Sequence, residues 1–168
     1  MSRPGAPRST RPWERVARAV RRSVGRSPQR RVPRSLRDQI GYAPEVDGEP
    51  DPGEVVWAWV TYDEDASRGK DRPVLVVGRR DGGPRPQWLG LMLSSQDHDL
   101  DAADEARHGR HWMDVGSGDW DHERRPSEVR LDRLLVLDDD AVRREGAVLD
   151  RVVFDAVLAA AREFHPLP

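Results

Sequence analysis

The sequence predicts a β-rich α+β domain that ends in a helix and is preceded by a basic N-terminal arm. Short runs of β-branched and aromatic residues, separated by turn residues, fill most of the domain, and an amphipathic helical pattern ends it. Short strands followed by a helix predict a compact, strongly bent sheet with a packed C-terminal helix. Charge separates the arm from the body. Residues 1–37 hold twelve arginines and one acid, whereas residues 38–168 carry an excess of acids.

We divide the chain into three parts. Residues 1–37 form the basic arm, which is either disordered or an amphipathic helix, because Trp13, Val16 and Val20 recur at helical spacing among arginines. Residues 38–52, rich in proline, glycine and acids, are interpreted as a linker. Residues 53–168 form the domain. A basic arm on an acidic body is typical of an interaction tail.

The predicted strands follow one another along the domain. They cover residues 54–61, 73–78, 88–93 and 111–115, and a fifth run at 129–137 alternates in its first half as a half-exposed strand does. The acidic stretch 97–105 is expected to be a connection. Among the tryptophans, Trp57, Trp59 and Trp88 lie at alternating strand positions and are expected in the core, which leaves Trp112 and Trp120 freer to stack on bases.

Two aspartates predict helix starts near the C-terminus. Asp140 could cap a short helix that ends at Gly146, and Asp150 could cap the final helix. The final helix carries one apolar stripe formed by Val153, Phe154, Val157, Leu158 and Ala161.

Composition excludes several classes of protein. The absence of cysteine excludes disulfides and thiolate metal sites, which fits the cytoplasm, and no segment approaches the roughly 18 apolar residues of a membrane span. The spacing of Asp97, Asp99 and Asp101 resembles a calcium loop, but Ala102 and His108 stand where glycine and glutamate are needed. We expect no metal and no cofactor.

Arg72 is the most informative residue of the chain. Pro73 follows it and pushes it toward extended geometry at the start of the apolar run 74–77, so its side-chain direction should be fixed. Lys70, the single lysine of the sequence, is two residues away. The pattern is typical of a phosphate-binding arginine at the mouth of a buried strand, although a surface ion pair is the simpler alternative.

The order of four stretches resembles the MazF/PemK family of toxin ribonucleases. These are Gly53-Glu54-Val55-Val56-Trp57, the segment from Gly69 to Val77 with its Arg-Pro, the strand end Leu93-Ser94-Ser95-Gln96, and residues 127–134 followed by the helix at 150–164. The resemblance covers residues 53–164 and leaves the arm unmatched.

The resemblance implies an SH3-like barrel of the MazF/PemK/CcdB type and a homodimer that a cognate antitoxin neutralises. It also implies metal-independent cleavage of single-stranded RNA, such as mRNA, at short sequences. Arg72 and Ser94 occupy the catalytic positions, and Lys70, Ser95, Gln96 and His98 are the expected RNA-binding residues.

Two departures from the family pattern bear on the chemistry. Ser94 replaces the usual threonine and keeps its hydroxyl, but it loses the methyl group that restricts the rotamer. Ser67 stands where some relatives have a glutamate, so the general base is unassigned. His98 could take that role, because an unperturbed imidazole has a pKa of about 6.5, or it could be a solvated loop residue. Ser94 and Ser95 could equally serve strand-end turn chemistry.

A second function stays open on the sequence. The same barrel could be a non-catalytic module that binds RNA, DNA or a protein, as in a gyrase poison or a degenerate toxin. The acidic body repels RNA, so binding requires a local positive patch or the arm.

Overall fold

The computed structural model describes residues 40–45, 49–80, 84–98 and 102–167, apart from the side chains of residues 144–146. Its centre is a seven-stranded antiparallel sheet, with the order β4-β5-β3-β2-β1-β7 and with β6 added to β3. The strands are β1 (Glu54–Thr61), β2 (Gly69–Arg80), β3 (Gln87–Ser94), β4 (Trp112–Gly116), β5 (Ser127–Arg130), β6 (Leu135–Asp138) and β7 (Val142–Val148). The helices are α2 (Ala102–Arg107), the short 3₁₀ turn η2 (Asp139–Ala141) and α3 (Arg151–Ala161). The predicted class, a β-rich barrel-like sheet with a C-terminal helix, is confirmed.

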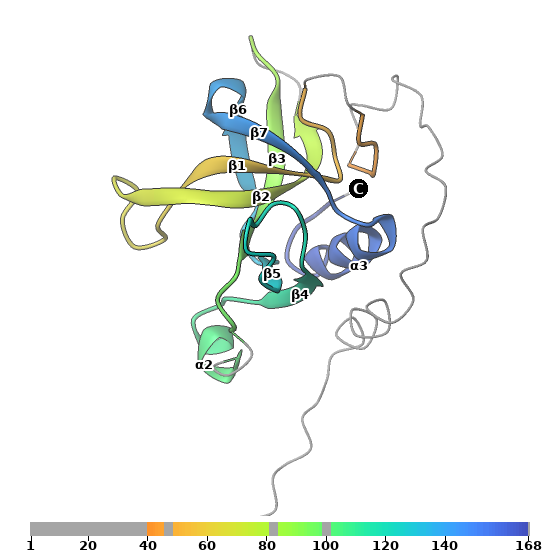
Figure 1. Ribbon diagram of the computed structural model, residues 1–168. Coiled ribbons are helices and arrows are strands. Elements are labelled where there is room, and N and C mark those ends of the chain that lie inside the picture. Colours follow the sequence, from red (N-terminus) through yellow and green to blue (C-terminus); the bar gives the residue numbers. More distant parts are fainter. Residues whose placement is uncertain (1–39, 46–48, 81–83, 99–101, 168) are drawn as a thin grey trace, which may run out of the picture.

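Strand β3 organises the sheet because it pairs with three others. One edge follows β2, while the other edge pairs with β6 near Gln87 and with β5 near Ser94. The two partners occupy successive stretches of this edge, and the sheet is bent into a barrel-like shape (Figure 1). The end of β3 is consequently held beside β5, away from β6.

The apolar run in β2 is buried on both faces of the sheet. Leu75 and Val77 belong to a cluster that includes α3, whereas Val74 and Val76 belong to a second cluster with Trp88 and other residues of the barrel interior. Alternating residues of a strand point to opposite faces, so a strand covered on both sides needs a continuous apolar run. This two-sided burial fixes β2, and with it the position of the polar residues that precede the run.

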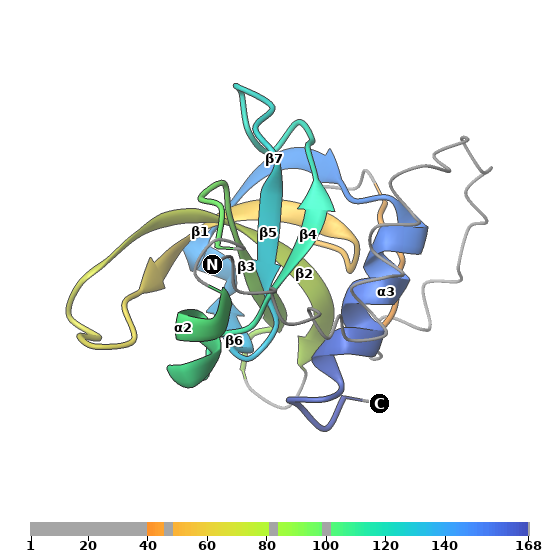
Figure 2. The ribbon, with the colours of Figure 1, turned by 90° about the horizontal axis from the view of Figure 1, so that it is seen from below.

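Helix α3 closes one side of the sheet. The Asp150 carboxylate caps it by accepting a hydrogen bond from the Val152 backbone N–H at 2.8 Å, as the sequence predicts. Phe154, Val157 and Ala161 are fully buried against the sheet. Figures 1 and 2 show α3 beside β4, with α2 on the other side of β4 and β5.

Three local predictions are wrong. Part of the acidic stretch forms α2, the run at 129–137 is divided into β5 and β6, and the helix expected before Gly146 is instead η2 followed by β7. Strand β7 pairs with the edge of β1, and this pairing overrides the local helical pattern. Strand β5 is buried throughout because β3 and β4 flank it and residues on both faces cover it.

Part of the predicted linker packs against the sheet. The Tyr42 hydroxyl donates a hydrogen bond to the Leu149 carbonyl at 2.9 Å, and the Tyr42 ring meets that of Phe154 at 5.3 Å. The Trp88 indole N–H donates to the Pro50 carbonyl at 2.6 Å. The basic arm lies outside the described residues, so the division of the chain at residues 37 and 52 stays a prediction.

The predicted burial of the tryptophans is confirmed only in part. Trp88 is buried as expected, but Trp59 is 55% exposed. Trp120 is only 4% exposed and donates its indole hydrogen to the Ser127 hydroxyl at 3.1 Å, so it is a core residue and unavailable for stacking. Within the part of the chain that the structure describes, no helix is both long and apolar enough to cross a membrane.

Candidate functional site

The sheet register brings Arg72 and Ser94 together. Strands β2 and β3 pair Val74 with Met92, so two residues beyond the last paired position Arg72 and Ser94 stand opposite each other. On the other edge of β3, Ser94 pairs with Glu128 of β5. Because every second residue of a strand points to the same face, Arg72, Ser94, Glu128 and Arg130 all belong to one face of the sheet. Residues distant in sequence thus share one surface.

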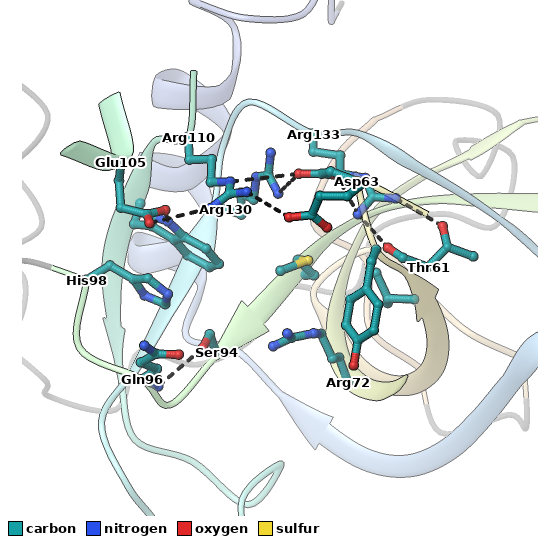
Figure 3. A pocket seen from close by; sticks show the side chains of 15 residues that line it. Thr61, Asp63, Arg72, Ser94, Gln96, His98, Glu105, Arg110, Arg130 and Arg133 are labelled. Atoms are coloured by element: carbon teal, nitrogen blue, oxygen red, sulfur yellow. Dashed lines mark hydrogen bonds and ion pairs between the residues drawn. The ribbon is translucent and has the colours of Figure 1, made fainter. Parts of the chain in front are cut away.

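A pocket of about 250 Å³ opens on this face. Figure 3 shows the side chains of Arg72, Ser94 and His98 around its open space, with Gln96 beside Ser94. Thr61 at the end of β1 contributes another wall, together with Tyr62 and Asp63 from the loop between β1 and β2.

A second pocket, of about 210 Å³, lies on the other side of Arg72 and Ser94. Lys70 and Ser95 line it, and Arg72, Ser94 and Gln96 line both pockets. The structure therefore brings all six sequence-predicted residues to two adjoining pockets: Lys70, Arg72, Ser94, Ser95, Gln96 and His98.

The second pocket contains an unsatisfied donor. Trp57 lines it, and the indole N–H of Trp57 is buried without a hydrogen-bond partner among the described residues. A buried N–H without an acceptor is unfavourable by about 1–3 kcal/mol.

Paired charges form the far wall of the first pocket. Arg130 contacts Asp63 at 2.6 Å and Asp132 at 2.8 Å, and Arg133 contacts Asp63 at 2.9 Å. Arg133 also donates to the Thr61 carbonyl at 2.8 Å. These contacts tie the loop after β1 to the end of β5 and the segment beyond it, as the dashed lines in Figure 3 show.

The pKa values in this network reflect the pairing. Burial by itself would raise the pKa of Asp63, but the hydrogen bond and positive charge of Arg130, with the charge of Arg133, lower it below its ordinary value. Burial would lower the pKa of Arg130, yet its hydrogen bonds to Asp132 and Asp63 outweigh burial and raise it. Both groups stay charged near neutral pH, and each neutralises the other.

Arg72 differs from these arginines because it makes no ion pair with any residue in the described part of the chain. Burial lowers the pKa of its guanidinium, and the positive charges of Arg130 and Arg133 act in the same direction. The surface ion pair considered for Arg72 is thus not observed among the described residues. A half-buried, unpaired guanidinium favours the arrival of an anion, and its planar donors suit a phosphate.

Ser94 is held at the junction of the two pockets. The residue is only 7% exposed, and its hydroxyl oxygen accepts a hydrogen bond from the Gln96 backbone N–H at 3.2 Å. The turn chemistry considered from the sequence is therefore present. The hydroxyl hydrogen has no acceptor among the described residues, so it can still be donated to a ligand.

His98 is fixed rather than solvated. Its Nδ1 lies 2.8 Å from a carboxylate oxygen of Glu128, and the same oxygen accepts the His98 backbone N–H at 2.9 Å. The imidazole ring stacks on Trp112, with ring centroids 3.8 Å apart and planes 6° apart. The alternative of an exposed loop residue is wrong.

The sequence interpretation missed the residues that support the site. Asp63, Arg130 and Arg133 form its paired wall, and Glu128 and Trp112 hold His98. Polar residues at alternate positions of β5, next to Val129, are the signal that could have revealed Glu128 and Arg130. For the described residues, no group of three or more metal-ligating side chains comes together.

Comparison with known families gives one match. The sequence model of a family described as the PemK-like, MazF-like toxin of type II toxin-antitoxin system matches residues 51–165. No curated protein matches the chain significantly.

Proposed function

Because the chain belongs to the PemK-like, MazF-like toxins of type II toxin-antitoxin systems, we propose that it is a sequence-selective endoribonuclease that cuts single-stranded RNA without a metal. One observation carries the proposal. Arg72, whose guanidinium has no carboxylate partner among the described residues, and Ser94 both line the junction of two open pockets. Its charged neighbours Arg130 and Arg133 already have carboxylate partners.

The reaction joins a ribose 2′-oxygen to the adjacent phosphorus and releases the 5′-oxygen of the next nucleotide. Negative charge builds on the non-bridging phosphate oxygens in the transition state. Arg72 and Ser94 can donate hydrogen bonds to those oxygens, and fixed donors in a partly dry site are the largest common source of rate enhancement. Their role is electrostatic, because a guanidinium is a poor proton donor even with a lowered pKa.

The two pockets supply a path for the RNA on either side of the cut. The first pocket takes one nucleotide beside His98 and Gln96, and the second takes its neighbour beside Lys70 and Ser95. The same residues could bind DNA, which lacks the attacking 2′-OH and would not be cut.

The partners follow from the family. We propose a cytoplasmic homodimer that a cognate antitoxin holds inactive until the antitoxin is lost. A non-catalytic module that binds nucleic acid or protein on the same barrel is the alternative, and the cleavage experiment separates the two.

The test is cleavage of a long RNA with paired and unpaired regions by purified, antitoxin-free protein in excess EDTA, with the cut ends mapped. Arg72→Ala should lower the rate by about 10²-fold to 10³-fold. Ser94→Ala should lower it while leaving RNA binding nearly unchanged. Arg143→Ala is the matched control, because Arg143 is exposed, pairs with Asp71 at 2.7 Å and lines neither pocket.

Discrete cuts in unpaired regions that vanish only in the two site variants are the expected result. RNA left intact by folded wild-type protein would overturn the ribonuclease and favour the binding module. Equal loss in Arg72→Ala and Arg143→Ala would show that general positive charge, and not the site, accounts for the activity.

A further inference from the structure

His98 is the one histidine among the residues that line the first pocket, and beyond its place beside the RNA it has no part in the chemistry described so far. Its side chain is 12% exposed, so the ring is largely enclosed yet still borders the pocket that Arg72 and Ser94 line. Figure 3 shows the ring facing the open space next to Ser94. Histidine is the side chain best suited to move a proton near neutral pH.

The contact with Glu128 decides which ring nitrogen carries the proton. One Glu128 oxygen accepts the His98 backbone N–H at 2.9 Å, so that atom is an acceptor, and it lies 2.8 Å from Nδ1. Nδ1 must therefore donate to it, and in the neutral ring the lone pair is left on Nε2. Nε2 has no hydrogen-bond partner among the described residues. The free nitrogen is the one that can accept a proton.

Three elements hold the ring in place. Glu128 is only 5% exposed and is anchored in β5, directly across from Ser94. Trp112 of β4 stacks on the ring, and its indole N–H donates to Glu105 of α2 at 3.0 Å. The imidazole thus has a fixed plane, a fixed tautomer and an open pocket before it, which are the requirements for a general base.

Resting on the proposed ribonuclease function, we propose that His98 is the general base of the cleavage reaction and that Glu128 is its positioning residue. The 2′-OH proton moves to Nε2 as the bond from the 2′-oxygen to phosphorus forms. The bond from phosphorus to the 5′-oxygen breaks, and that oxygen takes a proton from solvent water. The imidazolium then returns its proton to the hydroxide so formed. The products are a 2′,3′-cyclic phosphate and a 5′-hydroxyl.

Other charged groups border the same pocket, and their titration has to be distinguished from that of His98. They are Arg72 from β2, Arg130 from β5, Arg133 after β5, Glu105 from α2, Arg110 before β4, and Asp63 and Glu64, with the Tyr62 hydroxyl, from the loop after β1. Asp63 has a lowered pKa and Arg130 a raised one, so neither changes charge where imidazoles titrate. A rate that falls toward mildly acidic pH can therefore be assigned by removing His98 alone.

The experiment measures single-turnover cleavage of RNA against pH for the wild type, His98→Gln, Glu128→Gln and the control His108→Gln. His108 is an exposed histidine that follows α2 and borders neither pocket. We expect His98→Gln to slow cleavage by about 10²-fold or more and to abolish the acidic decline in rate. Glu128→Gln should slow cleavage by at least about tenfold, because an amide can hold the opposite tautomer. His108→Gln should behave as the wild type.

A second measurement does not depend on activity. Nitrogen-15 NMR of the ring nitrogens should show the proton of neutral His98 on Nδ1 in the wild type and on Nε2, or mixed, in Glu128→Gln. A proton on Nε2 in the wild type would overturn the proposal. If the wild type cleaves RNA and His98→Gln cleaves it with the same rate and pH profile, His98 is not the general base, but the proposed ribonuclease function is retained. A wild type that cuts no RNA would overturn both.

Discussion

At the scale of single residues, environment separates arginines of identical chemistry. Arg130 is buried between Asp63 and Asp132 and serves structure, whereas Arg72 has no carboxylate partner among the described residues and borders two pockets. Burial lowers the pKa of Arg72, while paired carboxylates raise that of Arg130 despite burial. A guanidinium without a partner is the one that can bind a phosphate.

Asp63 provides a prediction at this scale. Its folded-state pKa is lowered from 3.8 by Arg130 and Arg133, despite the opposing effect of burial. Its stabilising contribution is therefore complete above the unfolded value and is lost as pH falls through the lower folded value. We expect Asp63→Asn to lower the free energy of unfolding by about 1 kcal/mol near neutral pH, discounted for the partial exposure of the carboxylate.

Urea unfolding near pH 7 and at about pH 3 tests this prediction. The deficit of Asp63→Asn relative to the wild type should shrink at the acidic pH. Asp71→Asn is the matched control, since Asp71 forms an exposed pair with Arg143 that contributes little. A deficit of equal size at both pH values would contradict the lowered pKa.

At the scale of elements, strand pairing determines the secondary structure of segments whose local sequence pattern is ambiguous. Residues 142–148 have a helix start signal before them, yet they form β7 because the edge of β1 offers hydrogen-bond partners. Helix α3 differs, because its cap and its apolar stripe agree with its packing against the sheet. An element forms as predicted when local preference and tertiary burial favour the same state.

The cap of α3 is tested by Asp150→Ala. The carboxylate accepts the Val152 N–H at 2.8 Å, and losing an N-cap is unfavourable by about 1 kcal/mol. Asp155→Ala on the exposed face of the same helix is the control, because its pair with Arg151 at 3.7 Å is solvated. Thermal unfolding should show a lower midpoint for Asp150→Ala only. Equal shifts in the two variants would mean that helix charge, and not the cap, is measured.

At the scale of the whole molecule, the distribution of charge governs access to RNA. Twelve arginines lie in residues 1–37, and acids outnumber bases in the remainder. An acidic body repels a polyanion, so RNA binding requires a local positive patch, such as that around Lys70 and Arg72, or attraction by the arm. The arm would then raise the association rate without taking part in the chemistry.

Deleting residues 1–37 tests whether the arm contributes to RNA binding and not to the cleavage step. The affinity for single-stranded RNA should fall and its dependence on salt should flatten, because each lost phosphate contact reduces the slope of log affinity against log salt by about 0.7. The single-turnover rate at saturating protein should change little. An unchanged salt dependence would show that the arm does not contact RNA. Loss of the single-turnover cleavage rate at saturating protein would show that the arm takes part in catalysis.

Local chemistry allowed much of this protein to be predicted from its sequence. The strand at 54–61, the buried run after Pro73 and the cap at Asp150 follow from propensity and burial pattern. The six pocket residues are predicted from the resemblance of short motifs to the MazF/PemK family. These features depend on neighbours along the chain. The roles of the six residues stay predictions, but their gathering at one place is observed.

Only the tertiary structure decided which distant residues surround that place. Glu128 meets His98, and Asp63 meets Arg130, because the bend of β3 brings β5 beside its end and the loop after β1 closes over it. No spacing in the sequence encodes such contacts, since they depend on sheet register. The sequence by itself determined which side chains are candidates for the chemistry, because residue type and motif order are properties of the chain. The tertiary structure decided which arginines have carboxylate partners, that Arg72 has none among the described residues, and that Nδ1 of His98 lies against Glu128.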